Sequence, residues 1–453
     1  MMLKYSGSSF LRQRLVLSTI SGRPVKIDNI RAVDESPGLK DYEASLLRLL
    51  DKLTEGTQIQ VDETGTVLRY RPGQLMGGDG FIHDCGTSRS IAYFLEVLIM
   101  LAPFAKAPLS ITLRGITSDN RDPSIDTVRT VTLPLLRHFG VIEGLSLKII
   151  RRGAVPQGGG EVLFECPIVK KIAPVRLLDV GRIKRVRGVA FTARVSQQHA
   201  ARVVDRARGL LNRFLPDVWI YTEHAKGDKS GNSPGFGVSL VAETMKGFSK
   251  GADVCSDGTL QALTETTQTG DGQQSERISG RRSIVRQLAK REEEKTQMAG
   301  GNSQMDDESA GIESAMTQSE LVGKLAASRL LLEIRSGGVT DSTHQYLPLY
   351  FMALAEEHQQ CKVRLSRLTP YTVQFLRHVR DFLGVAFELT EDTDRMKEQT
   401  ELQTPLKAEE ELNDGQGLLQ DDGGEDENDG VFPSTVVCTC VGRGLVNIAR
   451  RTF

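Results

Sequence analysis

The sequence contains no apolar segment long enough to cross a membrane. Its longest apolar run, residues 97–105, has nine residues, whereas a membrane-spanning helix needs about 20. The first residues lack the hydrophobic region of a secretory signal. These two absences predict a protein that is neither embedded in a membrane nor exported.

Cysteine is scarce as well. Six cysteines in 453 residues do not form the dense pattern of a disulfide-stabilised domain, so we expect a reducing compartment. Cys438 and Cys440 share one face of a predicted strand, but no second pair at zinc-ligand spacing accompanies them. We therefore predict buried reduced cysteines, no metal site and no cofactor. The P-loop motif of many ATPases and GTPases is also absent.

Net charge is nearly absent, yet charge is unevenly distributed along the chain. The chain carries −1 overall, while residues 391–430 contain 15 Asp or Glu and three Lys or Arg. This segment therefore has a charge of −12, and the rest of the chain has a charge of +11. A basic body with an acidic appendage is common in proteins that handle nucleic acid, although many solvated surfaces are also basic.

Two segments lack the residues needed for a packed core. Residues 262–318 contain no Phe, Trp, Tyr, Pro or Cys, and residues 391–430 end in an acidic, glycine-containing run. Such segments cannot bury enough apolar surface to offset the entropy lost on ordering, so we predict both to be disordered. For residues 281–298 two interpretations stay open: a solvated insert, and an amphipathic helix that binds a partner.

The remaining residues alternate between strand and helix patterns. The order strand–helix–strand–strand recurs about every 80–90 residues, which favours tandem α/β units that share a core. The predicted strands cover residues 24–30, 57–61, 67–70, 108–113, 145–151, 160–166, 189–195, 218–222, 233–244 and 434–440. The predicted helices cover residues 39–53, 88–104, 124–139, 197–214, 319–334, 345–355 and 372–383.

The strand and helix patterns restart near residue 188, which predicts a smaller α/β domain inserted into a larger one. A basic stretch leads into this domain, with seven Lys or Arg and one Asp in residues 170–187. The stretch is either a solvated connector or a contact for phosphates or for an acidic peptide. Aromatic residues are not interleaved with the basic ones, so the stretch does not predict base stacking.

A glycine-rich string, RGAVPQGGGEV, occupies residues 152–162. It forms either a tight turn or a phosphate cradle, and a cradle requires a helix N-terminus after the glycines. A strand pattern follows here, which favours a turn within a hairpin. The string also resembles the signature of the RNA 3′-terminal phosphate cyclase superfamily. Residues 21–31, 113–140 and 330–354 resemble other segments of that family, in the same order.

The resemblance covers nearly all of the chain outside the two disordered segments. It implies three tandem α/β repeats, each a four-stranded sheet backed by two helices, with a smaller α/β domain inserted in the third repeat. The implied division is a large domain formed by residues 1–182 and 319–453, an inserted domain of residues 183–261 and a disordered insertion of residues 262–318. The acidic loop 391–430 belongs to the second part of the large domain.

The enzymes of this family use a histidine nucleophile, which takes up adenylate before a 2′,3′-cyclic phosphate is closed on RNA. The resemblance places Ser366 at the histidine position, and a serine without a neighbouring base is a poor substitute for imidazole. Glu96 replaces a glutamine and would repel nucleotide phosphates. We therefore predict a relic of the cyclase pocket, without cyclase activity, formed by Ser9, Arg12, Glu96, His344, Gln345 and Ser366.

These differences resemble the cyclase-like branch of the family rather than its enzymes. The branch implies a factor of ribosome biogenesis in the nucleus and nucleolus, within the small-subunit processome. Its implied role is in the early endonucleolytic cleavages of pre-rRNA that release the small-subunit rRNA. The implied partners are a large nucleolar GTPase, the pre-rRNA and the associated snoRNP, with no membrane contact.

The resemblance also matches Arg377, His378 and Arg380 to a cluster proposed to cut RNA in this branch. A metal-free RNase can use a histidine as general base with cations on the scissile phosphate, whereas a basic helix face is more often a binding surface. Our leading hypothesis is a non-catalytic scaffold that binds RNA and the GTPase, with contacts at Arg377, Arg380, Lys184, Arg185 and Arg187. The second hypothesis is an endoribonuclease, and the third is an ATP-dependent cyclase with a displaced nucleophile.

Overall fold

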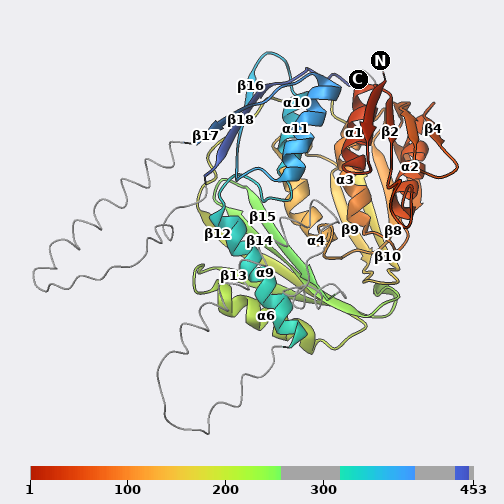
Figure 1. Ribbon diagram of the computed structural model, residues 1–453. Helices are drawn as coiled ribbons and strands as arrows, with labels where there is room; N and C mark the ends of the chain where they lie inside the picture. The colour runs from red at the N-terminus through yellow and green to blue at the C-terminus, as the bar shows by residue number, and fades with distance from the viewer. Residues whose placement is uncertain (1, 257–316, 393–433, 448–453) are drawn as a thin grey trace, which may run out of the picture.

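The structure, a computed structural model, describes residues 2–256, 317–392 and 434–447. Among the described residues four sheets have four strands each, and three of these share one strand order (Figure 1). In each sheet the first two strands in that order are parallel, and the other neighbours are antiparallel. The strands, in order of pairing, are β1 (Leu3–Ser6), β2 (Val25–Asp28), β5 (Leu68–Arg71) and β4 (Gln58–Val61); β7 (Gly78–Asp84), β8 (Leu109–Gly115), β10 (Gly160–Cys166) and β9 (Ser146–Arg151); and β11 (Arg176–Leu177), β16 (Gln360–Leu365), β18 (Val436–Val441) and β17 (Glu388–Glu391).

Helices between these strands contribute to one continuous apolar core with the three sheets. Helix α1 packs against α3 and α11, and α10 packs against α11. A short strand pair, β3 (Thr54–Glu55) with β6 (Gln74–Leu75), lies outside the main sheets. The helices are α1 (Leu11–Ser21), α2 (Asp41–Leu53), α3 (Ile91–Leu101) with the one-turn η1 (Ala102–Phe104), α10 (Tyr346–Leu354) and α11 (Pro370–Leu383).

The helix predicted over residues 124–139 is present but interrupted. It consists of α4 (Ile125–Thr127), the π-helical turn η2 (Val128–Thr132) and α5 (Leu133–Arg137). Ser124 caps its start, since its hydroxyl accepts a hydrogen bond of 3.2 Å from the Thr127 amide. Gly140 follows its end with a φ of 86°, a backbone conformation that favours glycine.

A fourth sheet lies below the other three in Figure 1 and has its own core. Its strand order is β13 (Val218–Ala225), β12 (Ile183–Ala193), β14 (Gly235–Thr244) and β15 (Ser249–Cys255). Helices α6 (Gln198–Leu211) and α9 (Gln318–Arg335) contribute to this core. The fold is therefore mixed α/β, with four-stranded mixed sheets backed by helices.

Helix α9 is the element whose packing differs from the predicted domain division. The prediction assigned residues 319–335 to the large domain, but α9 packs on α6, with Val322, Ala326 and Leu330 fully buried in the core of the fourth sheet. A helical pattern shows that one face is apolar, but it does not show which core covers that face. The division into domains stays a prediction, and residues 262–316 and 393–430 lie outside the described residues.

All six cysteines lie in the described part of the chain, and each is buried and outside any disulfide bond. Burial raises the pKa of the Cys438 and Cys440 thiols to about 12. This confirms the predicted pair of buried, reduced cysteines on one strand. Over the described ranges, no helix is long and apolar enough for a membrane span.

Candidate functional site

The predicted relic pocket is filled by side chains that bind one another. Arg12, near the start of α1, places Nη1 2.9 Å from Oε2 of Glu96 on α3. Oε1 of Glu96 accepts a hydrogen bond of 2.6 Å from the hydroxyl of Tyr371 on α11. All three side chains are buried, and buried polar groups require such partners because water no longer reaches them.

The same cluster continues from Arg12 to a fully buried carboxylate, Asp122. Oδ1 of Asp122 lies 3.6 Å from Nη1 of Arg12 and accepts a hydrogen bond of 3.2 Å from Nη2 of Arg89. Burial alone would lower the pKa of Arg89, but the charge of Asp122 raises it overall. The two guanidinium groups therefore face two carboxylates, Glu96 and Asp122. This balance leaves no excess positive charge there for the phosphates of a nucleotide.

Gln345 and Ser366 form a second group in the predicted pocket. Nε2 of Gln345 donates to Oγ of Ser366 at 2.9 Å and to the carbonyl of Arg367 at 3.0 Å. Oε1 of Gln345 accepts from the Thr369 amide and the Thr372 hydroxyl, both at 3.0 Å. Ser366 is 3% exposed, and no imidazole in the described ranges hydrogen-bonds to it. Its hydroxyl therefore lacks both the base and the access that a nucleophile needs.

His344 belongs to a different buried network. Its Nε2 lies 2.7 Å from the Thr132 hydroxyl, and its Nδ1 lies 2.7 Å from Oδ1 of Asp341. The order hydroxyl–imidazole–carboxylate is that of a catalytic triad. However, the three residues are at most 3% exposed, so a substrate cannot reach the hydroxyl. The network instead joins η2 to the start of α10.

The structure thus brings together two pairs of the six predicted pocket residues, Arg12 with Glu96 and Gln345 with Ser366. Tyr371 and Thr372, which are adjacent on α11, contact one pair each. Ser9 is exposed in the turn before α1, and His344 belongs to the separate network with Thr132 and Asp341. Asp122 and Tyr371 could not be identified from the sequence, because their partners are far away along the chain.

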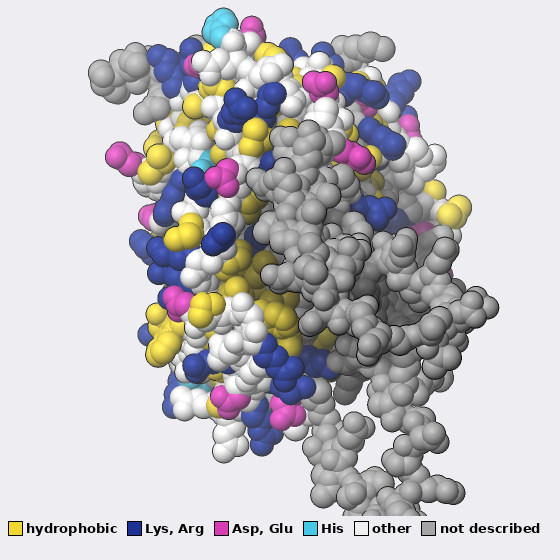
Figure 2. All heavy atoms as spheres, turned by 90° about the vertical axis from the view of Figure 1, so that its left-hand side faces the viewer, with side chains coloured by type: hydrophobic (Ala, Val, Ile, Leu, Met, Phe, Trp, Pro, Cys, Tyr) yellow, Lys and Arg dark blue, Asp and Glu magenta, His cyan; other side chains and the backbone are white. Residues whose placement is uncertain are grey.

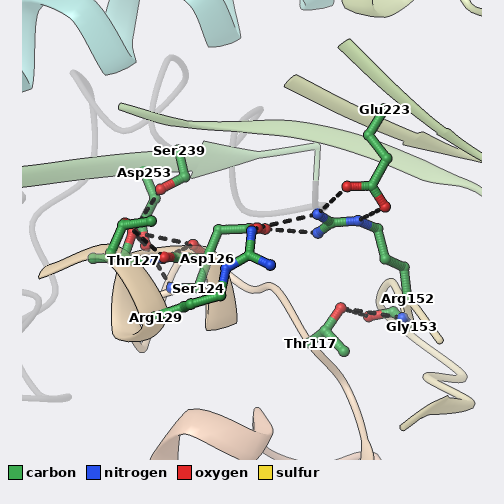
Figure 3. Close-up of polar contacts among 11 residues, drawn as sticks. Thr117, Ser124, Asp126, Thr127, Arg129, Arg152, Gly153, Glu223, Ser239 and Asp253 are labelled. Atoms are coloured by element: carbon green, nitrogen blue, oxygen red, sulfur yellow. Dashed lines mark hydrogen bonds and ion pairs between the residues drawn. The ribbon is translucent and has the colours of Figure 1, made fainter. Parts of the chain in front are cut away.

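A partly buried ion-pair cluster surrounds Arg152, the first residue of the glycine-rich string (Figure 3). Its Nη1 lies 2.6 Å from Oδ2 of Asp126, and its Nη2 lies 2.7 Å from Oε2 of Glu223 on β13. Burial opposes the charge of Arg152, but the two carboxylates raise its pKa overall. Arg129 also pairs with Asp126, at 3.1 Å. The cluster joins the β9–β10 connection, the interrupted helix and the fourth sheet, and sequence analysis did not identify it.

The glycine-rich string itself is a turn, as predicted, because β9 ends at Arg151 and β10 begins at Gly160. It packs against a loop of the fourth sheet: the Asn232 amide donates to the Gly158 carbonyl at 2.9 Å. A Cβ atom at Gly231 would lie 2.2 Å from the Gly158 carbonyl oxygen, so only glycine permits this approach. The string therefore connects two sheets rather than cradling a phosphate.

The predicted endoribonuclease cluster on α11 is divided between surface and interior. Arg377 and Arg380 are exposed, whereas His378 is fully buried. Nδ1 of His378 lies 2.9 Å from Oε1 of Gln13, and its Nε2 lies 3.1 Å from Nε2 of Gln374. Burial, together with a nearby arginine, lowers the pKa of His378 to about 3. This arrangement does not supply a general base for RNA held by the two arginines.

We expect His378 to make the fold acid-sensitive. Its folded-state pKa of about 3 lies below the value of about 6.5 in an unfolded chain, so between these values the unfolded state binds an extra proton. The stabilisation is complete above about pH 6.5 and is lost as the pH falls, by about 1.4 kcal/mol per pH unit. His378→Gln should reduce this slope in urea unfolding, and the exposed control His358→Gln should keep it. An unchanged slope for His378→Gln would contradict the buried neutral histidine.

The three basic residues predicted on the inserted domain lie on β12. Arg185 pairs with Glu243 and Arg187 with Asp217, at 2.7 and 2.8 Å. Lys184 is exposed and has no acidic partner among the described residues. Within the described ranges of the chain, no group of three or more His, Cys, Asp or Glu could hold a metal ion.

Comparison with known proteins identifies the class that this mixed α/β fold and closed pocket represent. The family described as RNA 3'-terminal phosphate cyclase matches residues 3–389. The chain belongs to this family.

Within the family, the chain is similar to cyclase-like proteins. The "Probable RNA 3'-terminal phosphate cyclase-like protein" of Dictyostelium discoideum is 42% identical over 452 residues, 100% of each chain. The "RNA 3'-terminal phosphate cyclase-like protein" of Mus musculus is 47% identical over 388 residues, 85% of this chain and 90% of the relative. The "rRNA processing protein rcl1" of Schizosaccharomyces pombe is 48% identical over 256 residues, 56% of this chain and 70% of the relative. These matches confirm the predicted resemblance to the cyclase-like branch.

Proposed function

We propose that this protein is a ribosome-biogenesis factor of the small-subunit processome and that it acts by binding rather than by catalysis. Its task is to support the early cleavages of pre-rRNA that release the small-subunit rRNA. A relative with 48% identity carries the name of an rRNA processing protein, which supports a role in the nucleus and nucleolus. The proposed partners are a large nucleolar GTPase, the pre-rRNA and the associated snoRNP.

We also interpret the first three sheets as tandem copies of one α/β unit. Their common strand order and pairing sense support this interpretation. The fourth sheet lies in the sequence between β11 and β16, which supports its interpretation as a domain inserted in the third copy. The insertion brings Glu223 of the fourth sheet onto Arg152, so the two parts share an ion-pair cluster.

The closed relic pocket is the observation that carries the non-catalytic proposal. Oε2 of Glu96 forms an ion pair with Nη1 of Arg12 at 2.9 Å, and the Glu96 carboxylate would repel phosphates. Ser366, at the position of the enzymes' histidine, is buried and is held by the Gln345 amide. A nucleotide would have to break both groups of contacts, and it would meet no nucleophile there.

Exposed cations supply the proposed binding surfaces. Arg377 and Arg380 lie on the solvent side of α11, within the +11 body of the chain. On the face shown in Figure 2, Lys and Arg side chains outnumber those of Asp and Glu among the described residues. Such cations attract phosphates without reading the base sequence.

The proposal can be tested in a cell that has been depleted of its own relative of this protein and that expresses this chain, or a variant of it, instead. We expect Arg377→Ala with Arg380→Ala to lower co-purification with the GTPase or pre-rRNA several-fold and to impair pre-rRNA cleavage in parallel. Arg69→Ala with Arg71→Ala is the matched control, because these arginines are also exposed but lie on β5. If the α11 variant assembled normally while cleavage stopped, the result would favour catalysis and contradict the proposal.

A further inference from the structure

The single tryptophan of the chain is exposed on the open face of the fourth sheet, beside a tyrosine. Trp219 and Tyr221 are 55% and 58% exposed, and their ring centres lie 6.1 Å apart. They alternate on β13 with Val218 and Ile220, which are buried in the core with α6. Two large aromatic side chains exposed side by side are unusual unless they bind something.

Basic residues of the neighbouring strand border these rings. The parallel pairing of β12 with β13 sets Arg187 beside Trp219 and Val189 beside Tyr221. Because side chains alternate along a strand, Arg185 lies on the same face as Arg187. Each arginine is held by one carboxylate, Glu243 or Asp217, at 2.7 and 2.8 Å. We call Trp219, Tyr221, Arg185 and Arg187 the aromatic platform.

The aromatic platform lies at an uncovered corner of the sheet. On the same face, the part formed by β14 and β15 is covered by the interrupted helix, since the Ser239 hydroxyl lies 2.9 Å from that of Thr127. Strand β13, in contrast, is the edge strand. Arg182 and Lys184 are exposed next to this corner, and neither has an acidic partner among the described residues. The local excess of cations therefore suits an anionic ligand.

We propose that the aromatic platform binds single-stranded RNA. Trp219 and Tyr221 stack on successive bases, and the cations of β12 contact the phosphates that connect them. A duplex would not fit, because its bases are stacked on one another and closed to the rings. The two exposed rings favour RNA over an acidic peptide, because bases stack on flat aromatic faces and carboxylate side chains do not. The inference rests on the proposed function, because that function supplies the RNA.

Tryptophan fluorescence tests the platform directly, because Trp219 is the only tryptophan. The probe is an unstructured single-stranded RNA of about 12 nucleotides, titrated into the full chain at several salt concentrations, with the matching duplex as a second probe. We expect the single strand to quench the emission and the duplex to bind much more weakly. Equal binding of both probes would overturn the proposal.

Variants separate stacking from general charge attraction. Trp219→Ala and Tyr221→Ala should each weaken RNA binding about fivefold or more. Trp219→Phe should retain most of the affinity of the unaltered chain. The anisotropy of labelled RNA measures the binding of each variant. The control Phe214→Ala removes an aromatic side chain that is 66% exposed outside the aromatic platform, and it should change nothing.

Three results would overturn the inference in different ways. If RNA bound without quenching and both variants behaved as the unaltered chain does, the platform would be wrong and RNA binding would stand. If the chain bound no RNA, the platform and the RNA part of the proposed function would fail together. Loss of GTPase binding alone in Trp219→Ala would mark a protein-docking surface and would also overturn the inference.

Discussion

Replacing Arg152 by methionine is expected to lower the free energy of unfolding by about 3–5 kcal/mol. The change leaves the buried Asp126 carboxylate, whose side chain is 3% exposed, without the guanidinium that lies 2.6 Å away. The remaining partner, Arg129, is 40% exposed and only partly compensates. Glu223 is half exposed and can be hydrated, so most of the loss arises at Asp126. Urea unfolding at neutral pH measures the difference.

Two further variants make this prediction specific. Arg129→Ala removes the exposed partner of the same carboxylate and should cost less than about 1 kcal/mol. Arg152→Met combined with Asp126→Leu should recover part of the loss, because no charge is then buried without a partner. Equal effects of Arg152→Met and Arg129→Ala would contradict the role given to burial.

Asp122→Asn is the second change expected to have a large effect, again about 3–5 kcal/mol. The asparagine keeps the shape of the side chain but removes the charge that faces Arg89 and Arg12. Asp122 is fully buried, so little water is available to replace the lost attraction. Arg12 contacts both Asp122 and Glu96. The loss of stability in Asp122→Asn therefore measures the cluster of contacts that fills the predicted pocket. Urea unfolding of the full chain measures it.

Asp217→Asn is the matched control for Asp122→Asn. Asp217 also pairs with an arginine through two hydrogen bonds, to Arg187 at 2.8 and 2.9 Å. It lies on the surface, where water screens the attraction, so we expect little change in stability. A loss for Asp217→Asn as large as that for Asp122→Asn would show that burial is not the source of the effect.

Much of the α/β pattern could be predicted, because most elements have one apolar face. The period-2 pattern of β2 and the helical period of α2 correspond to the burial pattern of these elements in the structure. Helix α1 could not be predicted in this way. Its polar residues Arg12, Gln13 and Arg14 are buried along with its apolar ones, so no solvent face produces a period.

The candidate site was less predictable, because its contacts join residues far apart in the sequence. The family resemblance named Arg12 and Glu96, but only the fold shows that they pair with each other. His378 stands between two exposed arginines in the sequence, and the helix turns it into the core. The aromatic platform was missed because its rings and its arginines lie on different strands, about 30 residues apart. The alternation of aliphatic and aromatic residues over 218–221 was the signal available in the sequence.

The central claim is that the cyclase pocket is closed and lacks a nucleophile, so that the protein binds rather than catalyses. Incubation of the purified full chain with radiolabelled ATP and magnesium, followed by denaturing electrophoresis, tests this claim most directly. A catalytically active family cyclase, labelled in parallel, is the control. We predict no labelled band for this chain, because Ser366 is buried and bound by Gln345. A protein band carrying adenylate would contradict the claim and would show that a nucleophile survives.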